Sequence, residues 1–353
     1  MKSTPYFPCQ CHIIPDVVFK ELKKKGTDVE SGSSERIDQD FREKRVEFAM
    51  VARLLPEMNA AEGKADRYVY NSQNTGKQKL KLSRKEDNAA AQDADVNAVY
   101  DNSGIVRDYF KNQLGWNSID GNGMDMLFNV HYMIQYNNAF WDGEQMTFGD
   151  GDGVNFSGFA RALDVSGHEL AHGVIQYTAG LVYKGQSGAL NEHFADVFGV
   201  AIAQWHLKHT ATTTDWLIGA GCMLGKFKGK GIRSMKSPSD PSVVIMAQPE
   251  HMDKIYKGTS DNGGVHINSG IPNKAFYLVS MDIGTQESAI LWFEALKLLK
   301  ATAKFKDLYR ALVIAATGLV TAKKIPATTK ASLDKAFLAV GINKITPKKS
   351  NKV

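Results

Sequence analysis

The spacing of apolar residues divides the chain into a mixed first half and a helical second half. Between residues 67 and 159, short apolar runs are separated by turn signals such as Asn122-Gly123, which predicts strands. The predicted strands cover residues 68–70, 80–82, 126–133 and 145–148, and residues 95–114 predict a helix. Later apolar residues recur at helical spacing, and the predicted helices cover residues 163–178, 189–209, 272–283, 288–299, 305–317 and 329–340. This order indicates an α+β fold, with an antiparallel sheet in the first half.

The first 60 residues form a separate unit in this pattern. Residues 16–25 predict a short amphipathic helix that ends at Gly26, and residues 37–55 predict a longer helix with an apolar stripe. Residues 56–66 are small and polar, as expected of a linker that a protease cuts. This unit is either a removable, inhibitory prosegment or a permanent helical cap.

A pair of histidines one helical turn apart is the strongest chemical signal in the chain. His168 and His172 stand at positions i and i+4 of a predicted helix, so both side chains lie on one face and can bind one metal ion. Glu169 lies beside them and is not needed as a ligand, so it is free to accept a proton from a metal-bound water. The alternative is that both histidines are ordinary polar residues on a buried helix.

A carboxylate in the next predicted helix completes a ligand set. Glu192 follows His172 after nineteen intervening residues. Two His and one Glu leave the fourth position of zinc open for water, as in catalytic rather than structural sites. Asp196 lies one turn after Glu192 and can accept the second N–H of a ligand histidine, which fixes its tautomer. Asn191 can do the same for the other histidine.

Five sequence blocks, in this order, resemble the thermolysin family of zinc endopeptidases. They are YNNAFWDG at 136–143, HELAH at 168–172, YTAGLVY at 177–183, GALNE at 188–192 and DNGGVHINSG at 261–270. The resemblance covers about residues 67–345 and implies a two-lobed metalloprotease: an N-terminal α+β lobe, a mostly helical C-terminal lobe, and the zinc helix between them. CHIIP at 11–15 resembles the compact prosegment of the protealysin-type branch, which favours the removable prosegment. The implied organisation is a helical prosegment at 1–60, lobes at 61–183 and 184–345, and a basic tail at 346–353.

The resemblance also implies roles for residues around the metal. Tyr183 and His266 match donors that stabilise the oxyanion formed during peptide hydrolysis. Asp261 matches the residue that keeps His266 oriented and protonated. Zinc-bound water would be the nucleophile, and Glu169 would take its proton and pass it to the leaving amine.

Other matches concern substrate binding. Asn138 and Ala139 match residues that hydrogen-bond the backbone of a substrate lying beside an edge strand. Trp141 is expected in the same groove, and Arg233 matches an arginine that holds the carbonyl just beyond the scissile bond. The pocket for the residue after the scissile bond is expected to be lined by Phe156, Val165, Ile218 and Ile232.

These assignments predict a zinc-dependent neutral endopeptidase that is made as an autoprocessed zymogen. An apolar pocket predicts cleavage on the N-terminal side of bulky apolar residues, with broad specificity because apolar pockets discriminate only modestly. The expected partners are protein and peptide substrates, with the chain's own prosegment acting as an intramolecular inhibitor.

The chain departs from the family at the paired calcium site. Asp164 and Asp215 stand at two of its positions, but Ala203, Leu217 and Ala220 stand where other acidic ligands would be. Calcium needs six to eight oxygen ligands, and two carboxylates are too few. The sequence therefore predicts that this calcium site is lost or very weak.

Composition and charge argue against several other classes. The net charge is +5 over 353 residues, and no alternation of basic and aromatic residues suggests a nucleic-acid groove. Apolar runs such as residues 311–320 are too short for a membrane span. Residues 1–14 lack the apolar core of a signal peptide, so the chain is expected to be cytoplasmic as synthesised, or exported by a non-standard route. We expect a monomer.

The three cysteines predict no disulfide framework. Cys9 and Cys11 are too close in sequence for an unstrained bridge. A thiolate from either could instead displace the zinc-bound water and hold the enzyme inactive, because thiolates bind zinc well. Steric blockage of the cleft by the prosegment is the alternative.

Two other functions are open on the sequence. A zinc aminopeptidase can share the zinc motif, but it needs an acidic anchor for the substrate amine, and the sequence shows no such signature. A permanently capped binding module would keep zinc without cutting, although every expected catalytic position is filled.

Overall fold

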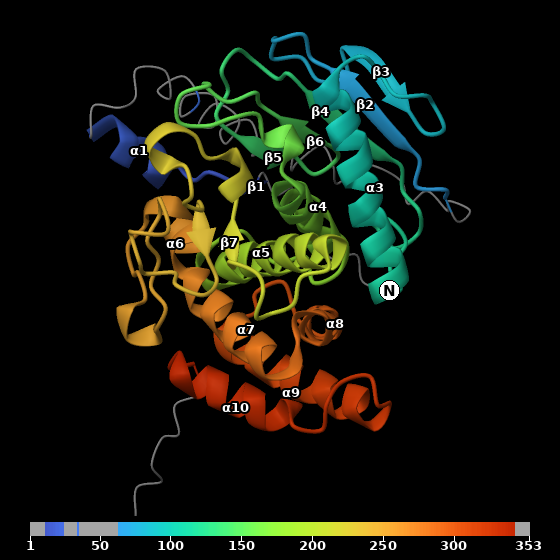
Figure 1. The fold of residues 1–353 in the computed structure, drawn as a ribbon. Helices are drawn as coiled ribbons and strands as arrows, with labels where there is room; N and C mark the ends of the chain where they lie inside the picture. Colours follow the sequence, from blue (N-terminus) through green and yellow to red (C-terminus); the bar gives the residue numbers. More distant parts are fainter. Residues whose placement is uncertain (1–10, 25–33, 35–62, 343–353) are drawn as a thin grey trace, which may run out of the picture.

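Six short strands form a sheet at one end of the molecule, and helices fill the rest (Figure 1). The computed structural model describes residues 11–24, 34 and 63–342. The strands are β1 (Cys11–His12), β2 (Arg67–Asn71), β3 (Lys81–Lys85), β4 (Met126–Val130), β5 (Ala139–Trp141) and β6 (Met146–Phe148). Their order across the sheet is β1-β5-β6-β4-β2-β3. The predicted α+β lobe followed by a helical lobe is confirmed.

The sheet itself is mixed, so the prediction of an antiparallel sheet was wrong. β2 pairs in parallel with β4, and β4 pairs in parallel with β6, whereas the other neighbours are antiparallel. The chain between β2 and β4 contains β3 and the helix α3 (Ala94–Leu114), which is long enough to return it in the same direction. Apolar periodicity is the same in both directions and cannot distinguish them.

Helix α3 begins and ends at clear sequence signals. The side chain of Asp93 accepts hydrogen bonds from the backbone N–H groups of Asp95 and Val96, at 3.0 and 3.2 Å, which caps the first turn. Gly115 ends the helix with a φ of +68°, a left-handed conformation that glycine adopts without strain.

Two central helices carry the three predicted metal ligands and Glu169. They are α4 (Leu163–Tyr177) and α5 (Gly185–Leu207), close to the predicted spans. Figure 1 shows α4 between the sheet and α5, and both helices are buried on almost every side. A helix that is apolar on nearly all faces belongs in the interior of a protein.

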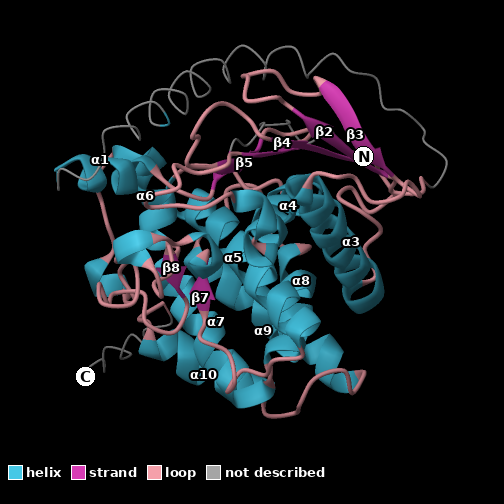
Figure 2. Cartoon of the chain, turned by 45° about the horizontal axis from the view of Figure 1, so that its top comes forward, coloured by secondary structure: helices cyan, strands magenta, loops and turns pink. Residues whose placement is uncertain are grey.

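The remaining described helices surround α5, and α7 to α10 lie on its side away from the sheet (Figure 2). They are α6 (Ser260–Asn268), α7 (Gly270–Ile283), α8 (Thr285–Leu296), α9 (Phe305–Thr321) and α10 (Thr329–Ala339), with a small sheet of β7 (Leu217–Ile218) and β8 (Arg233–Ser234). The predicted helices correspond to α7 to α10. The sequence did not predict α6, because residues 261–264 have left-handed φ values that interrupt the helical period.

The N-terminal segment packs onto both lobes. Helix α1 (Asp16–Lys24) buries Val18, Phe19 and Leu22 in the same apolar cluster as the sheet and α4. This helix was predicted, whereas the helix predicted at 37–55 and most of the linker at 56–66 lie outside the described residues. Among the described helices, none is both long and apolar enough to cross a membrane.

Candidate active site

Glycines allow α4 and α5 to cross closely enough for their polar side chains to meet. A Cβ atom at Gly199 would lie 2.6 Å from the carbonyl oxygen of Asp164 and 3.2 Å from the backbone nitrogen of His168. A Cβ atom at Gly167 would lie 3.1 Å from the Cα atom of Gly199. The crossing therefore leaves room only for hydrogen atoms, and it brings the histidines of α4 against the carboxylates of α5.

Three side chains from these two helices converge on one point. The Nε2 atoms of His168 and His172 lie 3.1 Å apart. Glu192 places Oε2 3.6 Å from Nε2 of His168 and Oε1 3.6 Å from Nε2 of His172. All three side chains are fully buried. The structure thus brings together the predicted ligand set.

The outer nitrogens of both histidines face acceptors. Nδ1 of His172 lies 2.7 Å from Oδ1 of Asn191, and Nδ1 of His168 lies 2.8 Å from Oδ1 of Asp196. These acceptors keep a proton on each Nδ1, so both Nε2 atoms present lone pairs to each other. Burial also lowers the pKa of His172 to about 3, so its ring is neutral.

This donor set fits a divalent cation, and zinc in particular. Two lone pairs and a carboxylate face one another, and Oε2 of Glu192 is buried without a hydrogen-bond partner among the described residues. A tetrahedral zinc ion at about 2.0–2.1 Å from two nitrogens holds them ~3.3 Å apart. The observed separation is 3.1 Å. Without a cation, this buried oxygen would lack a partner, which is unfavourable.

Because the crossing sets this geometry, we expect Gly199→Ala to lower both the stability of the protein and its zinc content. A methyl group that meets a backbone carbonyl cannot be relieved by side-chain rotation, and overpacking costs about 1–3 kcal/mol. Thermal unfolding and bound zinc per chain measure the two effects.

The matched control is Gly318→Ala in α9, where a Cβ atom meets no described atom within 4 Å apart from the nearby backbone of its own helix. We expect this control to be neutral or slightly stabilising, since alanine favours helices over glycine. Equal behaviour of the two variants would contradict the packing argument.

Glu169 is held beside the ligand set. Its Oε2 accepts a hydrogen bond from the backbone N–H of Trp141 at 3.1 Å, and its Oε1 is buried with no partner in the part of the chain that the structure describes. Burial, and then the neighbouring carboxylate of Glu192, raise the pKa of Glu169 well above its ordinary value, which strengthens it as a base. The sequence did not predict the orienting N–H of Trp141, because backbone donors leave no signature in side-chain motifs.

A left-handed turn positions His266 next to the ligand set. At Gly264, with φ of +81°, a Cβ atom would lie 2.6 Å from Cδ1 of Tyr256, so the turn requires glycine. The turn places Oδ1 of Asp261 2.6 Å from Nδ1 of His266, while Oδ2 of Asp261 accepts from the backbone N–H of His266 at 2.8 Å. Burial lowers the pKa of His266, but Glu192 and Asp261 outweigh it and raise the pKa overall, which favours the doubly protonated ring.

Tyr183 lies between His266 and the ligand set. Its hydroxyl donates to Oε1 of Glu192 and lies 3.0 Å from Nε2 of His266. Nε2 of His266 is itself 3.4 Å from Oε1 of Glu192. The two side chains predicted as oxyanion donors are therefore adjacent to each other and to the point where the ligands meet.

The buried carboxylate of Asp196 contacts both the predicted metal ligand His168 and the predicted substrate-binding residue Arg233. Asp196 accepts two hydrogen bonds from Arg233, from Nε at 3.1 Å and from Nη2 at 2.8 Å, and one from Nδ2 of Asn273 at 2.8 Å. Together with His168, this makes Asp196 the centre of a fully buried network. Sequence reasoning missed Asn273, whose only signal is a polar side chain within the apolar helix α7.

The N-terminal segment occupies this site as an added strand. β1 pairs antiparallel with β5, with Cys11 opposite Trp141 and His12 opposite Phe140. The N–H of the next residue, Ile13, donates to a carbonyl oxygen of β5 at 3.2 Å. The carbonyl that it meets belongs to Ala139, as the resemblance implied for a substrate backbone.

Side chains of the site bind the next backbone groups of the N-terminal segment, those of Ile13 and Ile14. Arg233 donates from Nη1 to the carbonyl of Ile13 at 2.9 Å. The side chain of Asn138 accepts from the N–H of Ile14 at 3.0 Å and donates to the carbonyl of Ile14 at 3.0 Å. All three residues matched to backbone binding therefore contact a single extended peptide.

The residues expected to line the apolar pocket are buried. Its four predicted lining residues are at most 1% exposed and belong to the same buried apolar cluster as Ile13 and Ile14: Phe156, Val165, Ile218 and Ile232. Trp141 is also buried, and its indole N–H donates to Gln176 at 3.2 Å. The backbone of Trp141, rather than an open ring face, pairs with the N-terminal strand.

Cys11 lies at the metal-facing side of that strand. Its sulfur, one nitrogen of His172 and one oxygen of Glu192 all lie within 4.8 Å of one another. Cys11 is disulfide-bonded to a partner outside the described residues, and Cys222 is a free, buried thiol. The sequence did not lead us to expect this bridge. A disulfide sulfur carries no thiolate charge, so the thiolate hypothesis applies only to the reduced chain.

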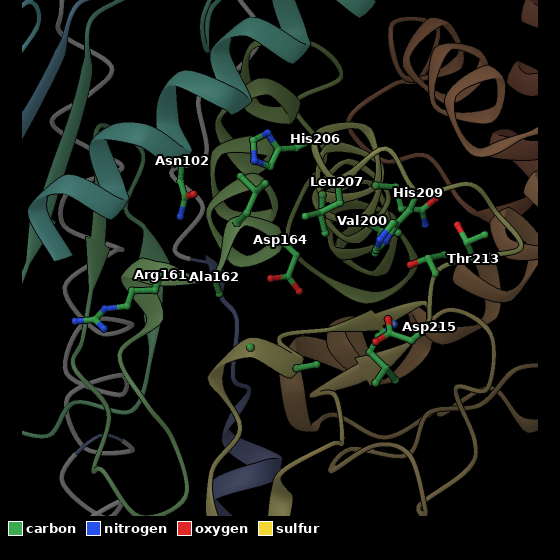
Figure 3. Close-up of a pocket in the computed structure, with 17 residues that line it drawn as sticks. Asn102, Arg161, Ala162, Asp164, Val200, His206, Leu207, His209, Thr213 and Asp215 are labelled. Atoms are coloured by element: carbon green, nitrogen blue, oxygen red, sulfur yellow. Dashed lines mark hydrogen bonds between the residues drawn. The ribbon is translucent and has the colours of Figure 1, made fainter. Parts of the chain in front are cut away.

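The five positions compared with the calcium site meet around one pocket of about 530 Å³. Figure 3 shows Asp164 and Asp215 among its side chains, and Ala203, Leu217 and Ala220 also line it. Asp164 accepts a hydrogen bond from a backbone N–H, that of residue 219, at 2.6 Å. Burial raises the pKa of Asp164, and the backbone hydrogen bonds that lower it do not offset this effect.

A second group of ligand-type side chains lies near the first turn of α3. Atoms of Asp93, Asp95 and His131 lie within 4.8 Å of one another. Their charges are already paired: His131 lies 2.9 Å from both Asp93 and Asp150, and Asp95 pairs with Arg161 at 2.5 Å. The hydrogen bond to Asp150 is the main cause that raises the pKa of His131 to about 9. We interpret this group as an ion-pair network.

Two family models match the chain. The model described as "Thermolysin metallopeptidase, catalytic domain" matches residues 25–176, and "Thermolysin metallopeptidase, alpha-helical domain" matches residues 179–342. Together they cover most of the chain, including every residue of the candidate metal site.

Individual relatives agree with the family models. An "Extracellular metalloprotease" of Pectobacterium carotovorum subsp. carotovorum is 38% identical over 318 residues, which is 87% of this chain and 89% of that protein. A "Thermolysin" of Alicyclobacillus acidocaldarius subsp. acidocaldarius is 41% identical over 267 residues, which is 72% of this chain but 45% of that longer protein. Among solved structures, the precursor of protealysin, a metalloproteinase from Serratia proteamaculans, matches with a TM-score of 0.79 and 34% identity, covering 94% of this chain and 100% of that one.

Proposed function

Because the chain belongs to the thermolysin family of zinc metalloendopeptidases, in its protealysin-type branch, we propose that it is a self-processing zymogen that cuts before bulky apolar residues. His168, His172 and Glu192 would hold the zinc ion. Zinc supplies a Lewis acid and lowers the pKa of a water molecule to about 7, so that a nucleophile exists at neutral pH. The convergence of these three buried side chains is the observation that carries the proposal.

The other residues of the site would move protons and stabilise charge. Glu169 takes the proton of the attacking water at Oε1 and passes it to the leaving nitrogen, while the N–H of Trp141 keeps the carboxylate aimed. His266 and Tyr183 donate to the carbonyl oxygen of the scissile bond as negative charge develops there. Asp261 holds His266 in the donating orientation.

The contacts of the N-terminal strand support both the specificity and the zymogen. The strand uses the hydrogen bonds that a substrate backbone would need, so substrate cannot bind while residues 11–14 are in place. Arg233 donates to the carbonyl of Ile13, the contact expected for the residue just after the scissile bond. The side chain of Ile13 is fully buried in the apolar cluster. We therefore infer that the mature enzyme prefers Leu, Phe, Ile, Val or Met at this position.

An internally quenched peptide that is blocked at both ends tests the endopeptidase function. We expect the matured protein to cut such a peptide before its apolar residue, and a chelator to abolish the reaction until zinc is restored. A zinc aminopeptidase would not cut a peptide that has no free amino end. A permanently capped zinc-binding module would neither cut the peptide nor lose its first 50–65 residues, as followed by intact mass.

We expect the structure to be independent of calcium. Asp164 and Asp215 are the only carboxylates among the described residues that line the pocket compared with the family's paired calcium site, too few for this ion. Adding calcium, or removing it with a calcium-selective chelator, should shift the Tm of the purified zymogen by less than ~1 °C. Stabilisation that saturates at millimolar calcium and disappears in Asp164→Asn would contradict this expectation.

A further inference from the structure

The N-terminal strand lies in the direction of a substrate, and two independent contacts mark its position. Nε2 of His266, one of the proposed oxyanion donors, lies 3.1 Å from the carbonyl oxygen of His12. Arg233, which matches the residue that holds the carbonyl just beyond the scissile bond, donates to the carbonyl of Ile13 at 2.9 Å. Both contacts place the His12–Ile13 peptide bond where a scissile bond would lie.

The contacts on either side agree with this register. The N–H of Ile13, which belongs to the bond itself, is bound by the carbonyl of Ala139 at 3.2 Å, and Asn138 holds both backbone groups of Ile14. Ile13 is 0% exposed and His12 is 2% exposed, so this part of the strand is shielded from water. A segment that merely blocked the cleft would not need its backbone to match every substrate contact.

We propose that the His12–Ile13 bond is the first substrate of this enzyme, cut within the same molecule when zinc is present. The inference rests on the proposed peptidase function and names one of its substrates. Hydrolysis consumes one water: the bond between the His12 carbonyl carbon and the Ile13 nitrogen breaks, His12 gains a carboxylate, and Ile13 gains an amino group. Glu169 carries the proton from the water to that nitrogen.

The cut alone would not release the cleft. Residues from Ile13 onward remain attached through α1, whose side chains Val18, Phe19 and Leu22 stay in the apolar cluster. Asn137 also donates its backbone N–H to Oγ of the buried Ser34 at 3.1 Å, a further attachment of the same segment. We therefore place this cut before the loss of the whole prosegment, with the tethered product still occupying the site.

The experiment compares the metal-free full-length chain with its Glu169→Gln variant after zinc is added. Intact mass and N-terminal sequencing should find a chain that begins at Ile13 in the first protein and none in the second. Its rate of formation should not change with protein concentration, because the bond is already in the site. A fully active enzyme whose released prosegment still contains an intact His12–Ile13 bond would overturn the proposal, while leaving the peptidase function in place.

Substitutions at Ile13 separate cutting from blocking. Ile13→Pro removes the N–H that Ala139 binds, so we expect no chain beginning at residue 13, whereas Ile13→Leu should still be cut there. If the strand only blocks the cleft, neither variant would yield such a chain, and this outcome would also overturn the proposal. Proper folding of both variants is checked by cleavage of the blocked peptide after the prosegment is removed by a second protease.

Discussion

Replacing Glu169 by Gln is expected to lower kcat/KM on the blocked peptide by about 10³–10⁴-fold, because the amide cannot take the proton of the attacking water. The bound zinc should stay at one ion per chain, since Glu169 lies beside the ligand set rather than in it. The amide oxygen can still accept from the N–H of Trp141, which is 3.1 Å from Oε2 of Glu169, so the fold should be retained.

The control for this prediction is Glu144→Gln, the same chemical change at an exposed position. It should leave both activity and zinc content unchanged. A Glu169→Gln protein that keeps more than about a tenth of the activity, or one that loses zinc, would show that Glu169 is not the base.

Replacing Arg233 by Met is expected to lower the free energy of unfolding by about 3–5 kcal/mol. The change removes both hydrogen bonds that Arg233 makes to Asp196 at 3.1 and 2.8 Å, and it leaves Asp196 with an uncompensated buried charge. Burial raises the pKa of Asp196, but the charge of Arg233 is the largest of the effects that lower it overall. The pKa of this carboxyl should therefore rise in the variant. Denaturant unfolding in a Glu169→Gln background avoids self-digestion during the measurement.

Arg310→Met provides the comparison, because Arg310 pairs with Asp307 at 3.2 Å on the surface, where ion pairs contribute little. We expect its effect to stay below about 0.5 kcal/mol. If Arg233→Met lowered the free energy of unfolding as little as Arg310→Met, Arg233 would not be what stabilises the buried charge of Asp196. The contact of Asp196 with His168 would then need another explanation.

The parts of the site that the sequence predicted are those with regular spacing. His168 and His172 share a helical face because of the helix period, and Glu192 and Asp196 share the next one. The family blocks supplied the partners that are distant in sequence, since no period connects His266 or Arg233 to α4. The helices of the second half were also predictable, because long apolar faces leave a strong signal.

The parts that the sequence missed depend on contacts rather than on periodicity. The strand β5 spans only Ala139–Trp141 and is too short for a recognisable alternation. The parallel pairing of β2 with β4 depends on the path of the connecting chain. The turn before His266 uses left-handed residues that interrupt the helical pattern, and the hydrogen bond from Trp141 to Glu169 comes from the backbone.

The structure also changes how the N-terminal segment is understood. From the sequence, residues 11–15 suggested either a thiolate ligand or a steric plug. The contacts of Ile13 and Ile14 instead match those of a bound substrate backbone, and Cys11 is disulfide-bonded rather than a thiolate. The same four contacts therefore explain why substrate would be excluded and which bond of the segment is presented for hydrolysis.

A crystal of the Glu169→Gln protein grown with zinc, and measured on both sides of the zinc absorption edge, tests the central claim most directly. We predict one anomalous peak about 2.0–2.2 Å from Nε2 of His168, Nε2 of His172 and a carboxylate oxygen of Glu192. A fully loaded protein whose zinc peak lies elsewhere, or whose three side chains leave that point empty, would contradict the account.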